Sequence, residues 1–257
     1  MVNESAFTVD ELQVTVHPDE QALGAATAEL LATGIAEALD RRGSARIILA
    51  TGNSQFPMTD ALAEREIDWS RVTVFHMDEY VGIPADHPAS FRRWMAERIV
   101  DRFAPAAMHV IEGDTADAAA ECRRYEALLR AAPIDVTCMG IGENGHLAFN
   151  EPGETDFDDQ QWARVISLDD KSRQQQVGEG HFAGLDDVPT HAITLTVPAL
   201  LSASRVIVAA PEARKADAVR TALTGTISTD CPASILRTVA HASLHLDPAS
   251  AAKINDR

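Results

Sequence analysis

The stretch GIGENGHLAFNEP, residues 140–152, combines glycines with residues that could carry out acid–base chemistry. Its glycines permit a tight turn and let backbone N–H groups approach a ligand closely. His146 lies inside this turn, and histidine is the side chain most easily poised to exchange a proton near neutral pH. Glu151 follows on another part of the loop and could orient the imidazole. A structural histidine bonded to a backbone carbonyl is the alternative, but the glycine pattern favours a functional one.

The same glycine spacing could also indicate a dinucleotide-binding turn. However, the motif lies past the middle of the chain, and an apolar segment follows it in place of a clear helix with a ribose-binding acid. We therefore interpret it as a ligand-binding loop, in which Gly142 brings the backbone close to the bound molecule.

A second group of chemically capable residues is HMDEY, residues 76–80, directly after a pattern typical of a buried strand. Its adjacent acids, Asp78 and Glu79, would be costly to bury without partners, so we expect one of them to point into a cleft. Partial burial would raise the pKa of that carboxyl toward the working pH and suit it to act as a general base. A capping or solvated pair of acids is the alternative.

A phosphate group could be held by two further features. Thr51, Gly52, Asn53 and Ser54 form a small-residue turn after ARIILA, where backbone N–H groups and hydroxyls would make an anion-binding cradle. Lys215 is one of only three lysines in the sequence, and it follows the strand pattern RVIVAAP. An ordinary N-capped turn and a solvated surface lysine are the respective alternatives.

The elements that must position these groups alternate regularly between strand and helix patterns. The pattern around residues 19–43 predicts a helix that ends on Gly43, whereas residues 153–187 form the least regular region. This alternation predicts one α/β domain over residues 1–257, doubly wound and Rossmann-like, with a mostly parallel sheet and helices on both faces. Ligands in such folds collect at the carboxyl ends of the strands, so we expect the polar turns to meet there. Strands are predicted at 12–18, 45–50, 71–76, 108–113, 134–140, 193–201, 205–211 and 242–247.

Composition limits the classes of partner. Apolar residues make up 46% of the 257, which allows a large core, and a formal charge of −17 argues against nucleic acid and anionic membranes as partners. No run approaches the roughly 20 apolar residues of a membrane span, and the N-terminus lacks the features of a secretion signal. Three cysteines without metal-ligand spacing suit a reducing environment, so we expect a cytoplasmic protein.

Two long motifs in this order, FHMDEYVGI and GIGENGHLAFNEP, resemble the glucosamine-6-phosphate deaminase family, which is grouped with the 6-phosphogluconolactonases. The resemblance extends from about residue 12 to residue 247 and includes the TGNS turn and the helix of Lys215. In the lactonase branch a Ser-Leu-Phe-Pro type of sequence typically follows the histidine motif. The AFNEP found in this chain favours the deaminase branch.

The resemblance implies conversion of glucosamine 6-phosphate to fructose 6-phosphate and ammonia, with no cofactor and no metal. His146, supported by Glu151, would open the sugar ring, and Asp78 would move a proton from C2 to C1. The turn at 51–54 and Lys215 would hold the phosphate. The implied partner is a small-molecule sugar phosphate, and the chain could form a homo-oligomer, as related enzymes commonly do.

The chain also departs from the family pattern. Asn144 stands where family deaminases commonly have an aspartate, so it would orient His146 without adding charge, and Glu143 beside it could compensate. On this interpretation Asn144→Asp raises turnover, unless the asparagine is adapted to another substrate. The arginine expected to contact phosphate after the histidine loop has an approximate match in Arg173, near Lys171.

These departures leave three alternatives open. The first is isomerisation or deamination of another hexose phosphate, such as galactosamine 6-phosphate. The second is hydrolysis of a phosphogluconolactone, in which the histidine activates water and Asp78 is not needed as a carbon base. The third is a non-catalytic sugar-phosphate sensor, against which the joint presence of Asp78, His146 and Glu151 argues.

Overall fold

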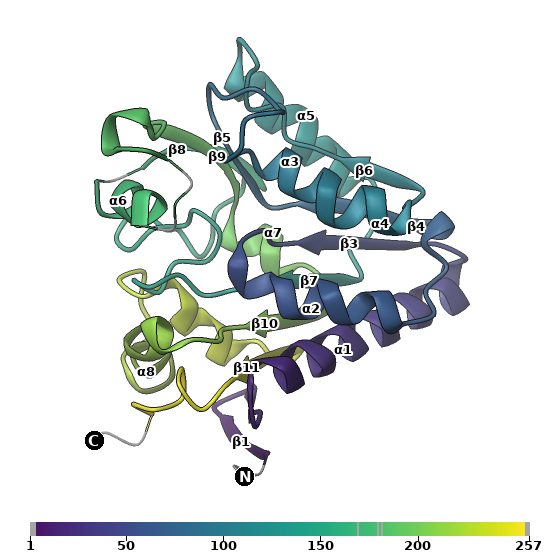
Figure 1. Cartoon of the computed structure of the whole chain (residues 1–257), viewed down its shortest axis with the longest axis vertical. Coiled ribbons are helices and arrows are strands. Elements are labelled where there is room, and N and C mark those ends of the chain that lie inside the picture. Colours follow the sequence, from purple (N-terminus) through teal and green to yellow (C-terminus); the bar gives the residue numbers. More distant parts are fainter. Residues whose placement is uncertain (1–3, 169, 179, 181, 255–257) are drawn as a thin grey trace.

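The computed structural model describes residues 4–168, 170–178, 180 and 182–254. Its main sheet has eight strands in the order β1-β2-β11-β10-β7-β3-β4-β6 (Figure 1). All neighbouring strands pair in parallel except the β1–β2 hairpin, so the sheet is mostly parallel, as predicted. The strands are β1 (Ser5–Val9), β2 (Leu12–Val16), β3 (Ala45–Leu49), β4 (Val72–His76), β6 (Ala107–His109), β7 (Val136–Met139), β10 (Arg205–Ala209) and β11 (Ala242–Leu246).

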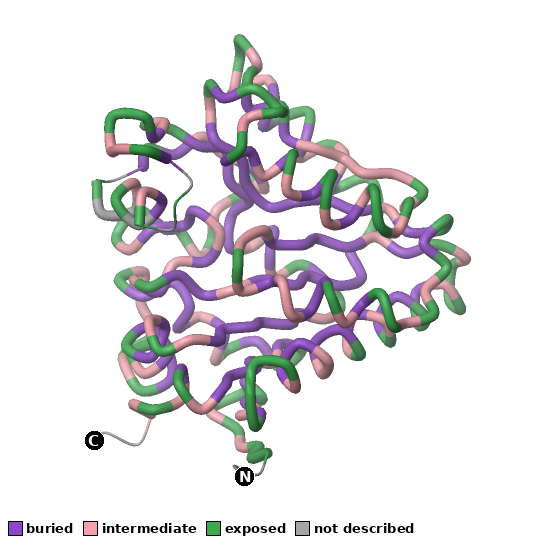
Figure 2. The backbone as a smooth tube through the Cα atoms, viewed as in Figure 1, coloured by how far each residue is buried: buried purple, intermediate pink, exposed green. Residues whose placement is uncertain are grey.

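Helices cover both faces of this sheet. Ile47 and Leu49 of β3 pack with α1, α2 and α3, whereas Ile48 between them packs with residues of α5, α7 and α8. Successive strand side chains point to opposite faces, so each strand contributes to both cores. Figure 2 shows that buried residues concentrate along the strands. The predicted α/β class with helices on both faces is confirmed. The helices are α1 (Glu20–Arg42), α2 (Phe56–Ala61), α3 (Phe91–Met95), α4 (Asp101–Phe103), α5 (Ala118–Arg130), α6 (Asp170–Gly178), α7 (Val197–Leu201) and α8 (Ala216–Thr224), with a π-helical segment at Ala96–Val100 between α3 and α4.

The long helix α1 has well-defined ends. The Asp19 side chain accepts a hydrogen bond from the Ala22 N–H at 2.8 Å, and Gly43 closes the helix with φ 76°, as the sequence predicted. By length and composition α1 is apolar enough to cross a membrane, which the sequence pattern had not suggested. Its buried face nevertheless packs on β3, β7 and β10, where it serves as a core helix of the sheet.

A second, smaller sheet was not expected. Its three antiparallel strands are ordered β5-β9-β8, with β5 at Asp78–Tyr80, β8 at Ala163–Ser167 and β9 at His191–Leu195. The strand predicted at 193–201 therefore lies outside the main sheet, and it ends where α7 begins. Part of the region that looked irregular in sequence forms β8 and α6.

The topology brings the polar turns together. β10, β7 and β3 are neighbours near the middle of the main sheet. The turn of Thr51 follows β3, the histidine loop follows β7, and Lys215 follows β10. Because parallel strands end at the same edge, these three turns lie side by side. The β5 strand, which begins with Asp78, comes after β4, the other neighbour of β3.

Candidate active site

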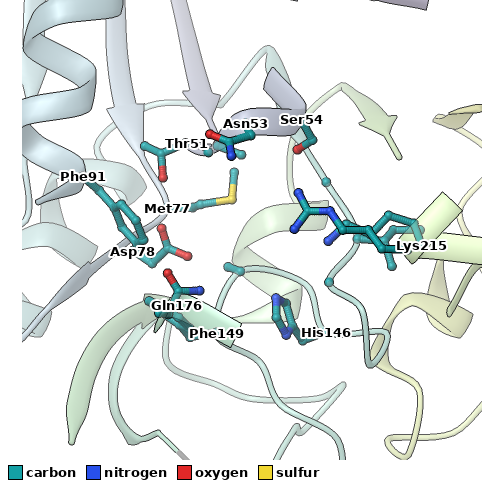
Figure 3. A pocket seen from close by; sticks show the side chains of 17 residues that line it. Thr51, Asn53, Ser54, Met77, Asp78, Phe91, His146, Phe149, Gln176 and Lys215 are labelled. Carbon is teal, nitrogen blue, oxygen red and sulfur yellow. The ribbon is translucent and has the colours of Figure 1, made fainter. Parts of the chain in front are cut away.

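A pocket opens at this edge of the sheet (Figure 3). Its empty volume, which includes open solvent at the mouth, is about 710 Å³. The acid, the imidazole, the turn and the lysine predicted from sequence share this one pocket. The residues that line it are Ala50, Thr51, Gly52, Asn53, Ser54, Met77, Asp78, Phe91, Gly140, Ile141, Gly142, His146, Ala148, Phe149, Gln176, Arg214 and Lys215.

The two adjacent acids of β5 have opposite surroundings, because consecutive strand residues point to opposite faces. Glu79 is fully buried and accepts hydrogen bonds from the Ser90 hydroxyl at 2.7 Å and from the Arg92 N–H at 2.9 Å. The N–H groups of Tyr80 and Phe91 donate to it as well, and the Arg92 guanidinium lies 3.3 Å away. Glu79 is therefore a structural acid that fixes the start of α3.

Asp78 faces the pocket with only 7% of its surface exposed. Within the described part of the chain, no group donates a hydrogen bond to its carboxylate. Burial, and secondarily the charge of Glu79, raises the pKa of Asp78 to about 8. A carboxylate that is poorly solvated and unpaired is more basic than usual, which suits it to take a proton from carbon.

The histidine loop depends on its glycines. A Cβ on Gly142 would lie 2.2 Å from His146 Nε2, so only glycine lets the imidazole lie against this backbone. Gly145 adopts φ 90°, and a Cβ there would also meet the Cys231 sulfur at 2.8 Å. The Gly142 N–H donates to the His146 carbonyl at 2.9 Å, which closes the turn. The loop is thus built around the position of the imidazole.

His146 is supported by a short polar chain. Its Nδ1 lies 3.3 Å from Glu151 Oε1, within ion-pair distance although not aligned for a hydrogen bond. Asn144 Nδ2 donates to Glu151 Oε2 at 2.6 Å, and Asn144 Oδ1 accepts from the His146 backbone N–H at 3.1 Å. Flipping the amide would break both bonds, so the asparagine fits this position chemically. An aspartate at 144 would instead place a second carboxylate against Glu151.

The loop is also fastened to the small sheet. Asn150 Nδ2 donates to the carbonyls of Leu147 and Leu195 at 2.7 and 2.8 Å, and the Phe149 N–H donates to the Thr194 hydroxyl at 3.1 Å. Thr194 lies opposite Asp78 in the β5–β9 pairing. These bonds hold the imidazole and the carboxylate on opposite walls of one pocket.

The cationic end of the pocket is formed by the turns that follow β3 and β10 of the main sheet. Gly52 adopts φ 102°, a conformation that favours glycine, and Ser54 approaches so closely that a Cβ on Gly140 would lie 3.3 Å from its hydroxyl. Lys215 is buried, with 6% of its surface exposed, although it carries a charge. Arg214 lies beside it on the pocket wall. This arrangement has the charge and the donors for an anionic group.

Two residues considered from sequence, Arg173 and Glu143, do not line the pocket. Arg173 donates to the carbonyls of Leu185 and Val188 and does not line the pocket, so the geometry gives its predicted phosphate contact no support. The side chain of Lys171 lies outside the described residues. Glu143 pairs with Arg214 at 3.2 Å and does not line the pocket beside His146.

Several lining residues are not among the site residues predicted from sequence. Phe91 and Gln176 come from helices that the motifs do not include, and the Tyr80 hydroxyl donates to Gln176 Oε1 at 2.7 Å. Figure 3 shows Gln176 and Asp78 among the side chains that line the pocket. Phe149 lies inside the motif at residues 140–152, in an apolar stretch to which the sequence assigned no chemical role. Arg214 could have been found as the second basic residue next to Lys215.

The fold and the site define a class: an α/β protein with a carboxylate, an imidazole and a cationic cradle in one pocket at the strand ends. The family model for "Glucosamine-6-phosphate isomerases/6-phosphogluconolactonase" matches residues 18–245. The chain belongs to this family of enzymes.

Individual relatives agree with this assignment. A glucosamine-6-phosphate deaminase of Exiguobacterium sibiricum is 39% identical over 208 residues, 81% of each chain, and one of Pseudarthrobacter chlorophenolicus is 38% identical over 232 residues, 88% of each. Among solved structures, a monomeric glucosamine-6-phosphate deaminase superposes with a TM-score of 0.85 at 30% identity, covering 93% of this chain and 98% of that one. A 6-phosphogluconolactonase of Shewanella baltica shares the fold, with a TM-score of 0.75 at 21% identity over 94% of this chain and all of that one.

Proposed function

We propose that this protein is a glucosamine-6-phosphate deaminase, which converts glucosamine 6-phosphate and water to fructose 6-phosphate and ammonia. The relatives named above support the substrate, and the pocket supports the reaction type. The observation that carries the proposal is the buried carboxylate of Asp78, which receives no hydrogen bond from the described residues and lies in the same pocket as His146.

The first step is opening of the sugar ring. His146 takes the proton of the anomeric hydroxyl and returns one to the ring oxygen, so that the ring C1–O bond breaks and an aldehyde forms at C1. Glu151 stabilises the imidazole while it carries the extra proton, since its carboxylate lies 3.3 Å from Nδ1. Asn144 is a positioning residue in this step, because it holds both Glu151 and the loop backbone.

The second step moves a proton between carbons. Asp78 removes the proton from C2, which the adjacent aldehyde makes acidic, and the electron pair forms a C1–C2 double bond. The aldehyde oxygen takes up a proton from the ammonium group on C2, which gives an enol that carries an amine at C2. Asp78 then delivers the proton to C1, which leaves an iminium at C2. Water adds to C2 and ammonia departs, leaving the ketone of fructose 6-phosphate. Every step uses groups of this chain, groups of the substrate and one water molecule.

The phosphate fixes the substrate relative to Asp78 and His146. We assign it to the turn at Thr51, Gly52, Asn53 and Ser54 with Lys215, on the cationic side of the pocket. Binding a remote group in this way holds the reacting carbons against the base, an effect that contributes strongly to catalysis.

Lactone hydrolysis is the competing function. It needs a histidine to activate water, but it gives a carboxylate in the position of Asp78 no proton to remove from carbon. The experiment is to assay the purified protein for ammonia release from glucosamine 6-phosphate and for hydrolysis of 6-phosphogluconolactone. We expect ammonia release that Asp78→Asn lowers about 1,000-fold. Rapid lactone hydrolysis that survives Asp78→Asn would establish the competing function instead.

We also propose that the whole chain acts as one catalytic domain in the cytoplasm. The cysteines among the described residues are free and buried, as expected where thiols stay reduced. Galactosamine 6-phosphate, assayed beside the glucosamine compound, tests which epimer the pocket prefers.

A further inference from the structure

Arg214 is a second positive charge on the pocket wall. Among the described residues that line the pocket, Lys215 and Arg214 are the cations. In a chain with a formal charge of −17, an anionic ligand depends on local cations. Arg173 was expected from sequence to contact the phosphate, but its guanidinium donates to backbone carbonyls outside the pocket.

The guanidinium of Arg214 is held in a defined orientation. Its Nε and Nη2 donate to the two carboxylate oxygens of Glu212, at 2.8 and 3.1 Å. Its Nη1 donates to Glu143 Oε1 at 3.2 Å. Because a guanidinium presents its donors in a fixed plane, the bidentate contact with Glu212 sets where the Nη1 edge points.

The two carboxylates belong to different parts of the site. Glu212 precedes Arg214 by two residues, whereas Glu143 lies in the histidine loop, next to Asn144. The Arg214 and Glu143 side chains are 29% and 39% exposed, and partly exposed ion pairs contribute little net stability. A phosphate carries more charge than a carboxylate and offers more acceptor oxygens, so it would compete well for this edge.

We propose that Arg214 is a second phosphate-binding residue of this pocket, oriented by Glu212, and that Glu143 competes with the phosphate for its Nη1 edge. The inference rests on the proposed function only in that the natural ligand carries a phosphate group. Glu143 then lowers phosphate affinity, because each binding event must displace it. The pair makes the pocket selective for ligands charged strongly enough to do so.

The proposal predicts effects of opposite sign for the two partners. Arg214→Ala weakens binding of inorganic phosphate about tenfold or more, the scale of one charge-assisted hydrogen bond. Glu143→Gln strengthens it by about three- to tenfold. In a protein that already carries Arg214→Ala, Glu143→Gln leaves the phosphate affinity unchanged, because the guanidinium for which Glu143 competes is absent. Arg214→Lys keeps the charge without the planar fork and gives an intermediate loss.

The experiment is titration of the full-length protein and each variant with inorganic phosphate by calorimetry, with thermal melting to confirm folding. Arg93→Ala and Glu97→Gln are the matched controls, since this exposed pair has a 2.7 Å contact and lies away from the pocket. Both controls should bind phosphate like the parent protein.

Two results would overturn the inference. Unchanged phosphate affinity in both Arg214 variants would show that the residue does not bind the anion. Weaker binding in Glu143→Gln, parallel to Arg214→Ala, would show that the pair only supports the loop. Ammonia release is scored separately, so a protein that binds phosphate as predicted but releases no ammonia would refute the proposed function and leave this inference standing.

Discussion

The two walls of the pocket treat their polar groups differently. In the histidine loop each key group is supported: His146 by Glu151, Glu151 by Asn144, and the Asn150 amide by two backbone carbonyls. On the β5 wall, Asp78 receives no hydrogen bond from the described residues and is buried to 7% exposure.

The two walls therefore differ in what they provide: one fixes the orientation of His146, and the other keeps the Asp78 carboxylate basic. In the proposed reaction the histidine moves protons between two oxygens, which requires a fixed orientation, and the contacts of its wall provide one. In the same proposal the carboxylate takes a proton from carbon, which requires basicity, and hydrogen-bond donors would lower that basicity. Glu79, the neighbour of Asp78, shows what a fully satisfied acid looks like in the same strand.

The largest expected effect is on the β5 wall. Asp78→Asn should lower kcat about 1,000-fold, within the 10²–10⁴ range of general acid–base catalysis, while glucosamine 6-phosphate still binds. Glu79→Gln should instead lower the free energy of unfolding by about 1–3 kcal/mol, because it weakens buried hydrogen bonds. Steady-state kinetics and thermal melting of both variants check this. The contrast between the two acids is contradicted if both variants mainly lose kcat, or if both mainly lose stability.

The histidine wall should respond to displacement. Gly142→Ala puts a methyl group where Nε2 lies 2.2 Å away, so the imidazole must move, and a shift of about 1 Å can cost about 100-fold in kcat. Gly184→Ala is the control, since its Cβ would meet nothing closer than Asp187 Oδ2 at 3.7 Å. Measured kcat values for the two variants check this. Equal activities would mean that the imidazole position is not critical.

A smaller effect tests the support of His146. Asn144→Asp should lower kcat about tenfold, because a carboxylate replaces a donor 2.6 Å from Glu151 and like charges repel. This reverses the sign expected from sequence. The same repulsion should lower the melting temperature of Asn144→Asp. The double variant Asn144→Asp with Glu151→Gln should recover that melting temperature, since an amide again faces a carboxylate. Higher kcat in Asn144→Asp would show that charge matters more than this hydrogen bond.

The smallest expected effect is on stability as a function of pH. Because the pKa of Asp78 rises from 3.8 to about 8 on folding, the folded protein holds a proton that the unfolded chain has lost. Stability from this group is therefore full below pH 4 and is lost as the pH rises toward 8. Asp78→Asn lacks this loss, so its melting temperature should exceed that of the parent protein by a few degrees near pH 8 and much less near pH 5. A constant difference across this range would contradict the shifted pKa.

Elements with strong local patterns could be predicted from sequence. The helix around Leu31 and Ile35 has an apolar face and a glycine end, and strands such as Ala45–Leu49 are short apolar runs between turns. The convergence of the 51–54 turn with the histidine loop followed from parallel strand order. The small sheet did not follow, because β5 has three residues and its partner β9 is more than one hundred residues away.

Residues of the candidate pocket could be predicted by type, but their contacts could not. Asp78, His146 and Lys215 lie where the motifs indicated. The role of Asn144 needed the loop geometry, since only the observed bonds show that a neutral donor fits against Glu151. Gln176 reaches the pocket through tertiary placement, which no local pattern records, whereas Arg214 could be found in the sequence beside Lys215.

A crystal structure of Asp78→Asn with glucosamine 6-phosphate tests the central claim most directly. We predict the phosphate against Thr51–Ser54 and Lys215, C2 facing the side chain at position 78, and the ring oxygen near the His146 imidazole. A sugar bound with its phosphate beside position 78, or in another hollow, would contradict the account.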